Sequence, residues 1–347
     1  MAVEIVDIGV SAQGGCWDNY AAQRAPSPFF ATTWRDVLAE CFGHRPLYLM
    51  ARRAGAVVGI LPLFEMRSRL FGRRLVSLPF VDGGGVVADD ASAEEALVLA
   101  AVDAARQGGA ECLEIRHSCA LRAEIGGSWR LTRHKVRLAI DIGGDPAVHW
   151  AALSSRLRGK IRKAEKAGAV FSRGGAELRG EFYRVFCKNM RDLGTPVHAL
   201  SFFEAMLGRC EGCEIMLVRQ AGRPVAAALA VRRGATMELP WICSDYAHGT
   251  SHVNEFLYWN AIETACSEAC DRLDLGRSSV GAGTHKFKAQ WNPREHPLFW
   301  YTWSAADAHA TDLSPANPAF ALAIACWKHL PVAVANRLGP HLVRHLP

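Results

Sequence analysis

Two stretches of this chain repeat the same pattern of helix and strand, and this repeat limits the possible folds more than any other feature. EEALVLAAVDAARQGGAECLEIR (94–116) aligns without a gap with NEFLYWNAIETACSEACDRLDLG (254–276). Each copy reads as an amphipathic helix followed by a buried strand. A hairpin precedes each copy, with its turn at Ala54-Gly55 or at Ala221-Gly222. The same elements in the same order predict a duplicated α/β domain.

The remaining elements follow from local patterns of apolar residues and turn residues. The first copy is expected to contain strands 3–8, 47–52, 57–64, 74–78 and 112–116 and helices 33–41 and 94–107. The second is expected to contain helices 182–193 and 202–209 and strands 214–219 and 225–231. We therefore expect an N-terminal domain over 1–150, a C-terminal domain over 151–305, and an apolar, basic helical tail over 306–347.

The most charged stretch, LSSRLRGKIRKAEKAG (153–168), lies between the copies. Leu153, Leu157, Ile161 and Ala164 recur at helical spacing and predict a buried stripe. The other faces carry Arg156, Arg158, Lys160, Arg162, Lys163 and Lys166. A solvated helix face is the plain reading of such a charge run. Because six cations repel one another, we favour a phosphate-binding role, with Arg158, Arg162 and Lys163 as the candidate contacts.

The stretch DRLDLGRSSVGAGTHKFKAQW (271–291) carries the clearest chemical signal. It predicts a short buried strand, a Gly-rich loop from Gly276 to Gly283, and a short helix holding Phe287, Lys288 and Trp291. A lysine just past a strand end and a Gly-rich turn suits the stabilisation of a developing negative charge. The alternative is a solvated lysine on a helix that packs through its aromatic side chains.

Composition narrows the class of protein. Half of the residues are apolar, and the formal net charge of +6 is too small to indicate nucleic-acid binding by itself. The N-terminal segment has no signal-peptide pattern and no apolar run is long enough to span a bilayer, so we expect a cytoplasmic protein. Eleven cysteines without framework spacing indicate reduced thiols, and the pairs Cys210/Cys213 and Cys266/Cys270 do not predict a metal site.

Four motifs carry a resemblance to a known family. KIRKAEKAG (160–168), NEFLYWNAIE (254–263), LDLGRSSVGAGTHKFKAQW (273–291) and WKHLPVAVANRLGP (327–340) resemble the FemAB family of tandem acetyltransferase-type (GNAT) domains. The similarity is greatest to the branch associated with exosortase/PEP-CTERM and exopolysaccharide gene clusters. The resemblance implies two GNAT domains side by side, with mixed central sheets flanked by helices. It also implies transfer of an acyl or aminoacyl group to an amine in cell-envelope or exopolysaccharide biosynthesis.

The resemblance also implies the substrates. The donor is expected to be an acyl-CoA or an aminoacyl-tRNA, with no tightly bound cofactor, and the acceptor an amine on a small molecule, glycan or peptide. The chain lacks the long helical-hairpin insertion of some tRNA-using members. It also lacks a clear pyrophosphate loop of the acetyl-CoA type. Both donors therefore stay open.

Candidate catalytic residues follow from the motifs. In known members a Phe-Lys pair near the end of the second domain lies in the active site, which by position implies Phe287 and Lys288, the lysine stabilising the reacting carbonyl. Asp245 and Glu255 are candidate general bases, with Asp82 and His252 as further options. A turn-forming role for Asp245 or Asp82 is equally consistent with the sequence.

The candidate substrate contacts surround these positions. They are Phe287, Asp82, Asn254, Tyr258, Arg277, Ser278 and Trp291. Asn254 also fits a helix N-cap, and Arg277 also fits an ion pair with Asp274 or Glu255. The tail either docks on the domains or lies on an anionic membrane surface. A non-catalytic scaffold at the membrane face of an exosortase or exopolysaccharide system is therefore the alternative function.

Overall fold

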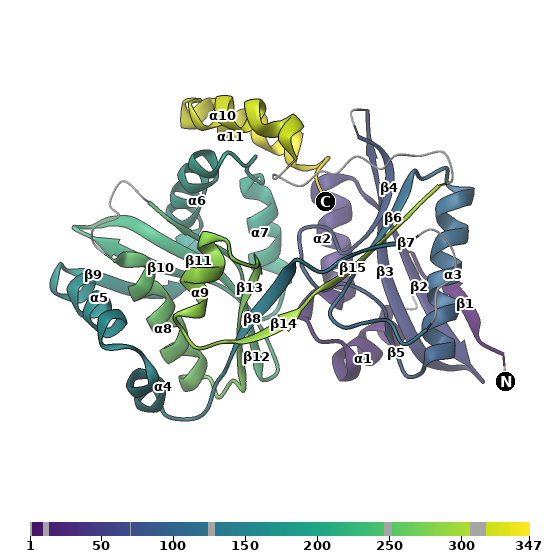
Figure 1. Ribbon diagram of the computed structural model, residues 1–347, viewed down its shortest axis with the longest axis horizontal. Coiled ribbons are helices and arrows are strands. Elements are labelled where there is room, and N and C mark those ends of the chain that lie inside the picture. Colours follow the sequence, from purple (N-terminus) through teal and green to yellow (C-terminus); the bar gives the residue numbers. More distant parts are fainter. Residues whose placement is uncertain (1, 10–13, 70, 124–128, 246–251, 306–316) are drawn as a thin grey trace. The chain divides into compact units, whose positions relative to one another are not determined.

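A computed structural model describes residues 2–9, 14–69, 71–123, 129–245, 252–305 and 317–347. The chain forms two compact units, each with its own mixed sheet and flanking helices (Figure 1). Unit 1 comprises Met1–Val136, His296–Asp312 and His345–Pro347. Unit 2 comprises Arg137–Glu295 and Leu313–Arg344. The predicted fold class, two mixed sheets with helices, is confirmed.

The described elements of unit 1 are, in chain order, β1 (Glu4–Asp7), α1 (Gly14–Arg24), η1 (Pro28–Phe30), α2 (Thr32–Phe42), β2 (Arg45–Arg53), β3 (Ala56–Ser68), β4 (Gly72–Ser77), β5 (Val87–Ala88), α3 (Ala91–Gln107), β6 (Cys112–His117), β7 (Trp129–Thr132) and β15 (Phe299–Ser304). Those of unit 2 are β8 (Lys135–Asp141), α4 (Pro146–Ala152), α5 (Ser155–Lys166), β9 (Ala169–Gly174), η2 (Ala176–Leu178), α6 (Arg179–Leu193), α7 (Leu200–Arg209), β10 (Cys213–Gln220), β11 (Arg223–Arg233), β12 (Thr236–Ser244), α8 (Val253–Ser267), β13 (Arg272–Ser279), α9 (Gly283–Ala289), β14 (Arg294–Pro297), η4 (Pro318–Phe320), α10 (Ala321–Lys328) and α11 (Val332–Val343).

The repeat seen in the sequence is a structural repeat. The strand order β1-β2-β3-β4-β6 of unit 1 matches β9-β10-β11-β12-β13 of unit 2. In both units the first three pairings are antiparallel and the last is parallel. The two hairpin turns also match, since Ala54 and Ala221 both adopt left-handed backbone angles, with φ of 50° and 49°. The helix between the parallel strands is α3 in one unit and α8 in the other.

The sheets are completed by strands taken from the other half of the sequence. β15, which follows the second repeat, pairs with β6 and β7 in unit 1. β8, which follows the first repeat, lies between β13 and β14 in unit 2. We call this arrangement the strand exchange. It moves the unit boundaries away from the predicted positions at 150 and 305, because a strand pattern does not say which sheet the strand joins.

Several predicted elements need correction. β13 runs from Arg272 to Ser279, so the segment predicted as a loop from Gly276 begins as strand. Trp291 lies beyond the end of α9 rather than within it. α1 and α4 are helices that the sequence did not indicate, since α1 opens on two glycines and α4 is short. The basic helix is confirmed as α5, with Leu157, Ile161 and Ala164 buried.

The tail forms α10 and α11, which contact α6 of unit 2 (Figure 1). Ala335, Gly339 and Val343 are the buried residues of α11. A Cβ added at Gly339 would lie 2.7 Å from the backbone nitrogen of Val197, so the two backbones approach closely there. The tail therefore packs on α6 of unit 2.

A buried histidine beneath β12 should make stability depend on pH. His198 packs against the rings of Phe202 and Trp241, and burial lowers its pKa to about 3. An unfolded histidine has a pKa near ~6.5, so below that pH the unfolded chain binds a proton that the folded chain does not. Stability should therefore fall as pH drops from ~6.5 toward ~3, by about 1.4 kcal/mol per pH unit.

Urea unfolding across this pH range measures the slope. His198→Leu should remove about 1.4 kcal/mol per pH unit from it. A slope equal to that of the wild type would contradict the assignment to His198.

Candidate active site

The site lies where two neighbouring strands of unit 2 diverge. The parallel pairing of β12 with β13 covers three residue pairs and ends at Glu238↔Asp274. β12 continues along β11 to Ser244, and β13 runs on to Ser279. Since α8 connects these strands, its first turn and the end of β13 belong to the same region of the unit.

A buried ion pair holds the narrow end of this divergence. Arg137 Nε of β8 lies 3.0 Å from Asp274 Oδ2, and Arg137 Nη2 lies 3.8 Å from Glu238 Oε2. All three side chains are less than a tenth exposed. Asp274 Oδ1 also accepts a hydrogen bond of 2.8 Å from the Gly276 amide. These contacts fix the strand that carries the candidate site.

The first turn of α8 presents Glu255. Lys160 Nζ of α5 donates to Glu255 Oε1 at 3.0 Å, and His252 Nδ1 lies 3.7 Å from the same oxygen. Glu255 is buried, so Lys160 compensates the charge of the carboxylate. The predicted N-cap, Asn254, is wrong: His252, with φ of 54°, is the N-cap, and Asn254 lies within the helix.

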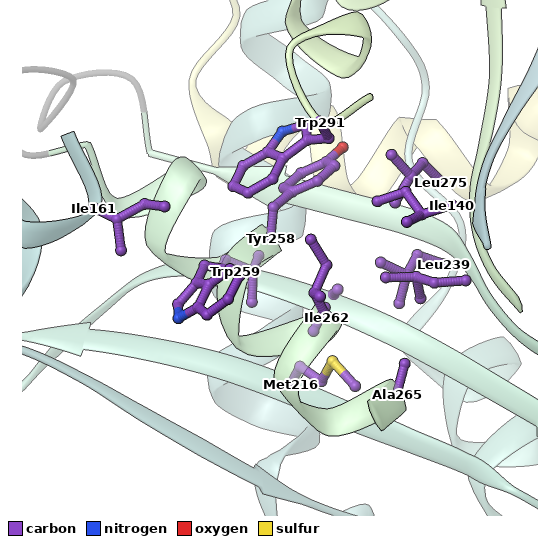
Figure 2. Packing of buried hydrophobic residues seen from close by; sticks show 14 of the residues in the cluster. Ile140, Ile161, Met216, Leu239, Tyr258, Trp259, Ile262, Ala265, Leu275 and Trp291 are labelled. Atoms are coloured by element: carbon purple, nitrogen blue, oxygen red, sulfur yellow. The ribbon is translucent and has the colours of Figure 1, made fainter. Parts of the chain in front are cut away.

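Lys288 lies in α9, next to an aromatic cluster. Its side chain is buried, and Nζ donates to the Arg277 carbonyl at 2.9 Å. The ring of Tyr258, one turn beyond Glu255 on α8, contacts Phe287 edge-on at 5.0 Å. It also stacks with the ring of Trp291, with ring centroids 5.6 Å apart and an interplanar angle of 17°. Figure 2 shows these two rings next to each other. α8 and α9 thus bring Glu255, Tyr258 and the Phe-Lys pair into one neighbourhood.

Three buried polar atoms of this neighbourhood have no hydrogen-bond partner among the described residues. They are Asn254 Oδ1, Ser278 Oγ and Trp291 Nε1. Leaving a buried polar atom unpaired costs about 1–3 kcal/mol, so such atoms commonly bind water or a ligand. Asn254 lies next to Glu255 in α8. Ser278 follows Arg277, whose carbonyl binds Lys288, and Trp291 comes just after α9, which carries Lys288. This agreement makes the neighbourhood a candidate substrate site.

Two further predicted residues are carried by elements other than α8, β13 and α9. Asp245 follows β12, and its carboxylate forms an ion pair with Lys188 of α6. Asn189 of α6 donates to the neighbouring Ser244 carbonyl at 2.9 Å. Asp245 is therefore held against α6, and residues 246–251, which follow it, lie outside the described residues. Asp82 belongs to unit 1, in the segment between β4 and β5.

The candidate phosphate contacts of α5 divide into two kinds. Arg158 Nη1 donates to the carbonyls of Trp150, Ala151 and Leu153 at 3.3, 3.2 and 2.6 Å. The carbonyls at the end of α4 therefore bind Nη1 of this guanidinium group, and the donor-binding role of Arg158 stays a prediction. Arg162 lies over the Trp150 ring at 5.3 Å and, like Lys163, is exposed.

Sequence reasoning missed the lysines that hold both candidate bases. Lys160 was one cation within a charge run, and Lys188 lay in an ordinary amphipathic helix. Each reaches its carboxylate only through tertiary packing, Lys160 across to α8 and Lys188 to the end of β12. The only signal in the sequence was the apolar stripe of α5, which indicated that one face of that helix is packed.

Two of the cysteines are disfavoured as nucleophiles by their burial. Burial raises the pKa of the Cys210 thiol to about 11 and raises the pKa of Cys243 further, which opposes formation of the reactive thiolate. Within the described residues, no group of His, Cys, Asp and Glu side chains is arranged to hold a metal ion.

Comparisons with known proteins agree with this geometry. Residues 151–289 match the model of the Acetyltransferase (GNAT) domain family. The crystal structure of FemX is similar over 87% of this chain and 97% of its own, with a TM-score of 0.68 and 13% identity. L-PGS from Bacillus licheniformis is similar over 91% and 96%, with a TM-score of 0.55 and 11% identity. No curated protein matches the sequence.

A tandem GNAT protein from the clavulanic acid biosynthesis pathway is also similar in structure. It is similar over 90% of this chain and 100% of its own, with a TM-score of 0.54 and 11% identity. The matched family model spans α5 to α9, which includes Glu255, Tyr258 and Lys288. Residues 151–289 are therefore similar to a GNAT acetyltransferase domain, and the chain shares the tandem fold of FemX and tandem GNAT proteins.

Proposed function

We propose that this protein forms an amide bond by transferring an acyl or aminoacyl group to an amine. The observation that carries the proposal is the placement of Lys288. The Lys288 side chain is buried, and its Nζ donates to the carbonyl oxygen of Arg277 in β13 at 2.9 Å. A fixed cation in a site shielded from water stabilises developing negative charge strongly.

The reaction needs three events at the carbonyl carbon of the donor. The amine nitrogen attacks this carbon and forms the new C–N bond, while the carbonyl oxygen becomes an oxyanion that Lys288 stabilises. A base takes a proton from the amine nitrogen. The bond to the leaving group then breaks, releasing a thiolate from an acyl-CoA or a ribose hydroxyl oxygen from an aminoacyl-tRNA, and the released group takes up a proton.

Glu255 is the base that we favour. It lies one helical turn from Tyr258, which contacts the helix of Lys288, whereas Asp245 is paired with α6. Lys160 Nζ donates a hydrogen bond of 3.0 Å to Glu255 Oε1, which fixes the position of the carboxylate. Asn254, Ser278 and Trp291 supply the unpaired buried atoms for substrate binding, and Phe287, Tyr258 and Arg277 surround them. Asp82 stays a proposed acceptor contact on sequence grounds.

The donor is an acyl-CoA or an aminoacyl-tRNA, and its phosphates would contact the exposed Arg162 and Lys163. We place the reaction in the cytoplasm, where both donors occur. The acceptor is an amine on a small molecule, a glycan or a peptide. Assignment to cell-envelope or exopolysaccharide biosynthesis, and to the exosortase-associated branch, rests on the sequence motifs alone.

Thermal unfolding with candidate donors should identify the donor class. A ligand at about 100 times its dissociation constant stabilises the folded state by roughly 2.7 kcal/mol. Stabilisation by acyl-CoA indicates a coenzyme A donor, and stabilisation by charged but not uncharged tRNA indicates an aminoacyl donor. Arg162→Gln with Lys163→Gln should reduce the shift, and Lys166→Gln, exposed on the same helix, should not. No shift with either donor would contradict the proposal.

A further inference from the structure

The two tail helices expose an unusual amount of apolar surface. Leu322 of α10 is 77% exposed, and Val334, Leu338 and Leu342 of α11 are 41%, 46% and 37% exposed. Within the described ranges, each helix outside the tail exposes at most one large apolar side chain. These four residues, which we call the tail apolar row, are the feature that needs an explanation.

Docking of the tail on unit 2 does not account for this row. α11 docks through Ala335, Gly339 and Val343, which recur every four residues and are buried. Each residue of the row on α11 precedes one of these by a single position, a rotation of about 100° around the helix axis. Hence α11 packs with one face on α6 and on Val197, and it presents a different apolar face to solvent.

The charge of the tail is one-sided. From Leu313 to Pro347 the sequence contains no Asp or Glu, while Lys328, Arg337 and Arg344 supply half of the formal net charge of +6. All three cations are exposed, and Arg337 adjoins Leu338. Exposed apolar side chains flanked by cations, with no acidic residues, are complementary to a surface with negative groups on the outside and an apolar layer beneath them.

We infer that α10 and α11 dock on the surface of an anionic lipid bilayer. The tail apolar row enters the boundary between headgroups and acyl chains, and the cations bind lipid phosphates. None of the described helices is both long and apolar enough to cross a membrane, so the contact is peripheral. A nucleic acid would engage the cations and leave the leucines exposed. A second copy would bring two acid-free, positively charged faces together.

Sedimentation of the full chain with vesicles tests this inference. Binding should occur with vesicles that contain phosphatidylglycerol and should be much weaker with phosphatidylcholine alone. Leu338→Asp should abolish it. Lys328→Gln with Arg337→Gln should weaken it by about fivefold for each charge removed, and added salt should weaken it as well. Leu99→Asp, at an equally exposed leucine of α3 in unit 1, is the matched control and should bind as the wild type does.

Several outcomes would overturn the inference. These are no sedimentation with anionic vesicles, equal binding to both vesicle types, and equal losses for Leu338→Asp and Leu99→Asp. A wild-type dimer that Leu338→Asp dissociates, without vesicle binding, would assign the row to a second copy instead. The variants change exposed residues far in sequence from Lys288, so their thermal unfolding should match the wild type. Vesicle binding needs no turnover, so its result is independent of the proposed transfer activity.

Discussion

Replacing Lys288 with methionine should lower the rate of acyl transfer by about 10²- to 10³-fold while the chain still folds. Methionine keeps most of the buried apolar volume but removes the ammonium group that we propose stabilises the developing oxyanion. The Arg277 carbonyl loses a donor, so stability should fall by roughly 1–3 kcal/mol. Steady-state kinetics with the donor identified by thermal unfolding, together with urea unfolding, separates the two effects. The loss should appear in kcat rather than in KM alone.

Lys286→Met is the matched control for this prediction. Lys286 lies on the same short helix and is exposed, so its removal should change the rate little. If the Lys288 variant folds and keeps near wild-type turnover, Lys288 does not stabilise the reacting carbonyl. If both variants lose activity equally, the effect comes from the charge of α9 as a whole.

Replacing Arg137 with methionine should destabilise the protein by about 3–5 kcal/mol, the largest stability effect that we expect. The change leaves the buried carboxylates of Asp274 and Glu238 without this guanidinium group. Because β8 and β13 are neighbouring strands, weakening this pair also loosens the strand that leads to the candidate site. Urea unfolding measures the loss, and the denaturant slope should be unchanged if the folded state keeps its compactness.

An exposed ion pair between β8 and its other neighbour, β14, provides the control. Arg294 of β14 lies 2.5 Å from Asp141 of β8, with side chains 74% and 55% exposed. Arg294→Met should cost less than about 1 kcal/mol, since exposed pairs are well solvated without each other. Adding Asp274→Asn and Glu238→Gln to Arg137→Met should recover part of the lost stability. Equal costs for the two single variants would argue against a buried charge effect.

Local features of the fold could be predicted from the sequence. The turn residues Ala54-Gly55 and Ala221-Gly222 placed both hairpins, and the stripe Leu157, Ile161 and Ala164 placed the buried face of α5. Each of these signals is contained within a few neighbouring residues, so no tertiary information is needed to read it. The resemblance then supplied the tandem fold and pointed to Phe287 and Lys288.

Features that depend on long-range partners could not be predicted. Lys160 meets Glu255, and Lys188 meets Asp245, only after helices far apart in the sequence pack on the same sheet. The stretch from Gly276 onward was predicted to be a loop because of its glycines, yet β13 continues to Ser279. Arg158 looked like its cationic neighbours, and only the position of the α4 carbonyls distinguishes it.

The strand exchange has a consequence for how the protein is made. β15 belongs to the sheet of the first unit, but the ribosome synthesises it after almost all of the second unit. In a nascent chain that ends before Phe299, β6 pairs with β4 only, and its other edge is open for other chains to join. Unit 1 therefore cannot complete its sheet until most of unit 2 has been synthesised. Truncation at the predicted boundary of residue 150 should accordingly yield an aggregation-prone fragment rather than a folded domain.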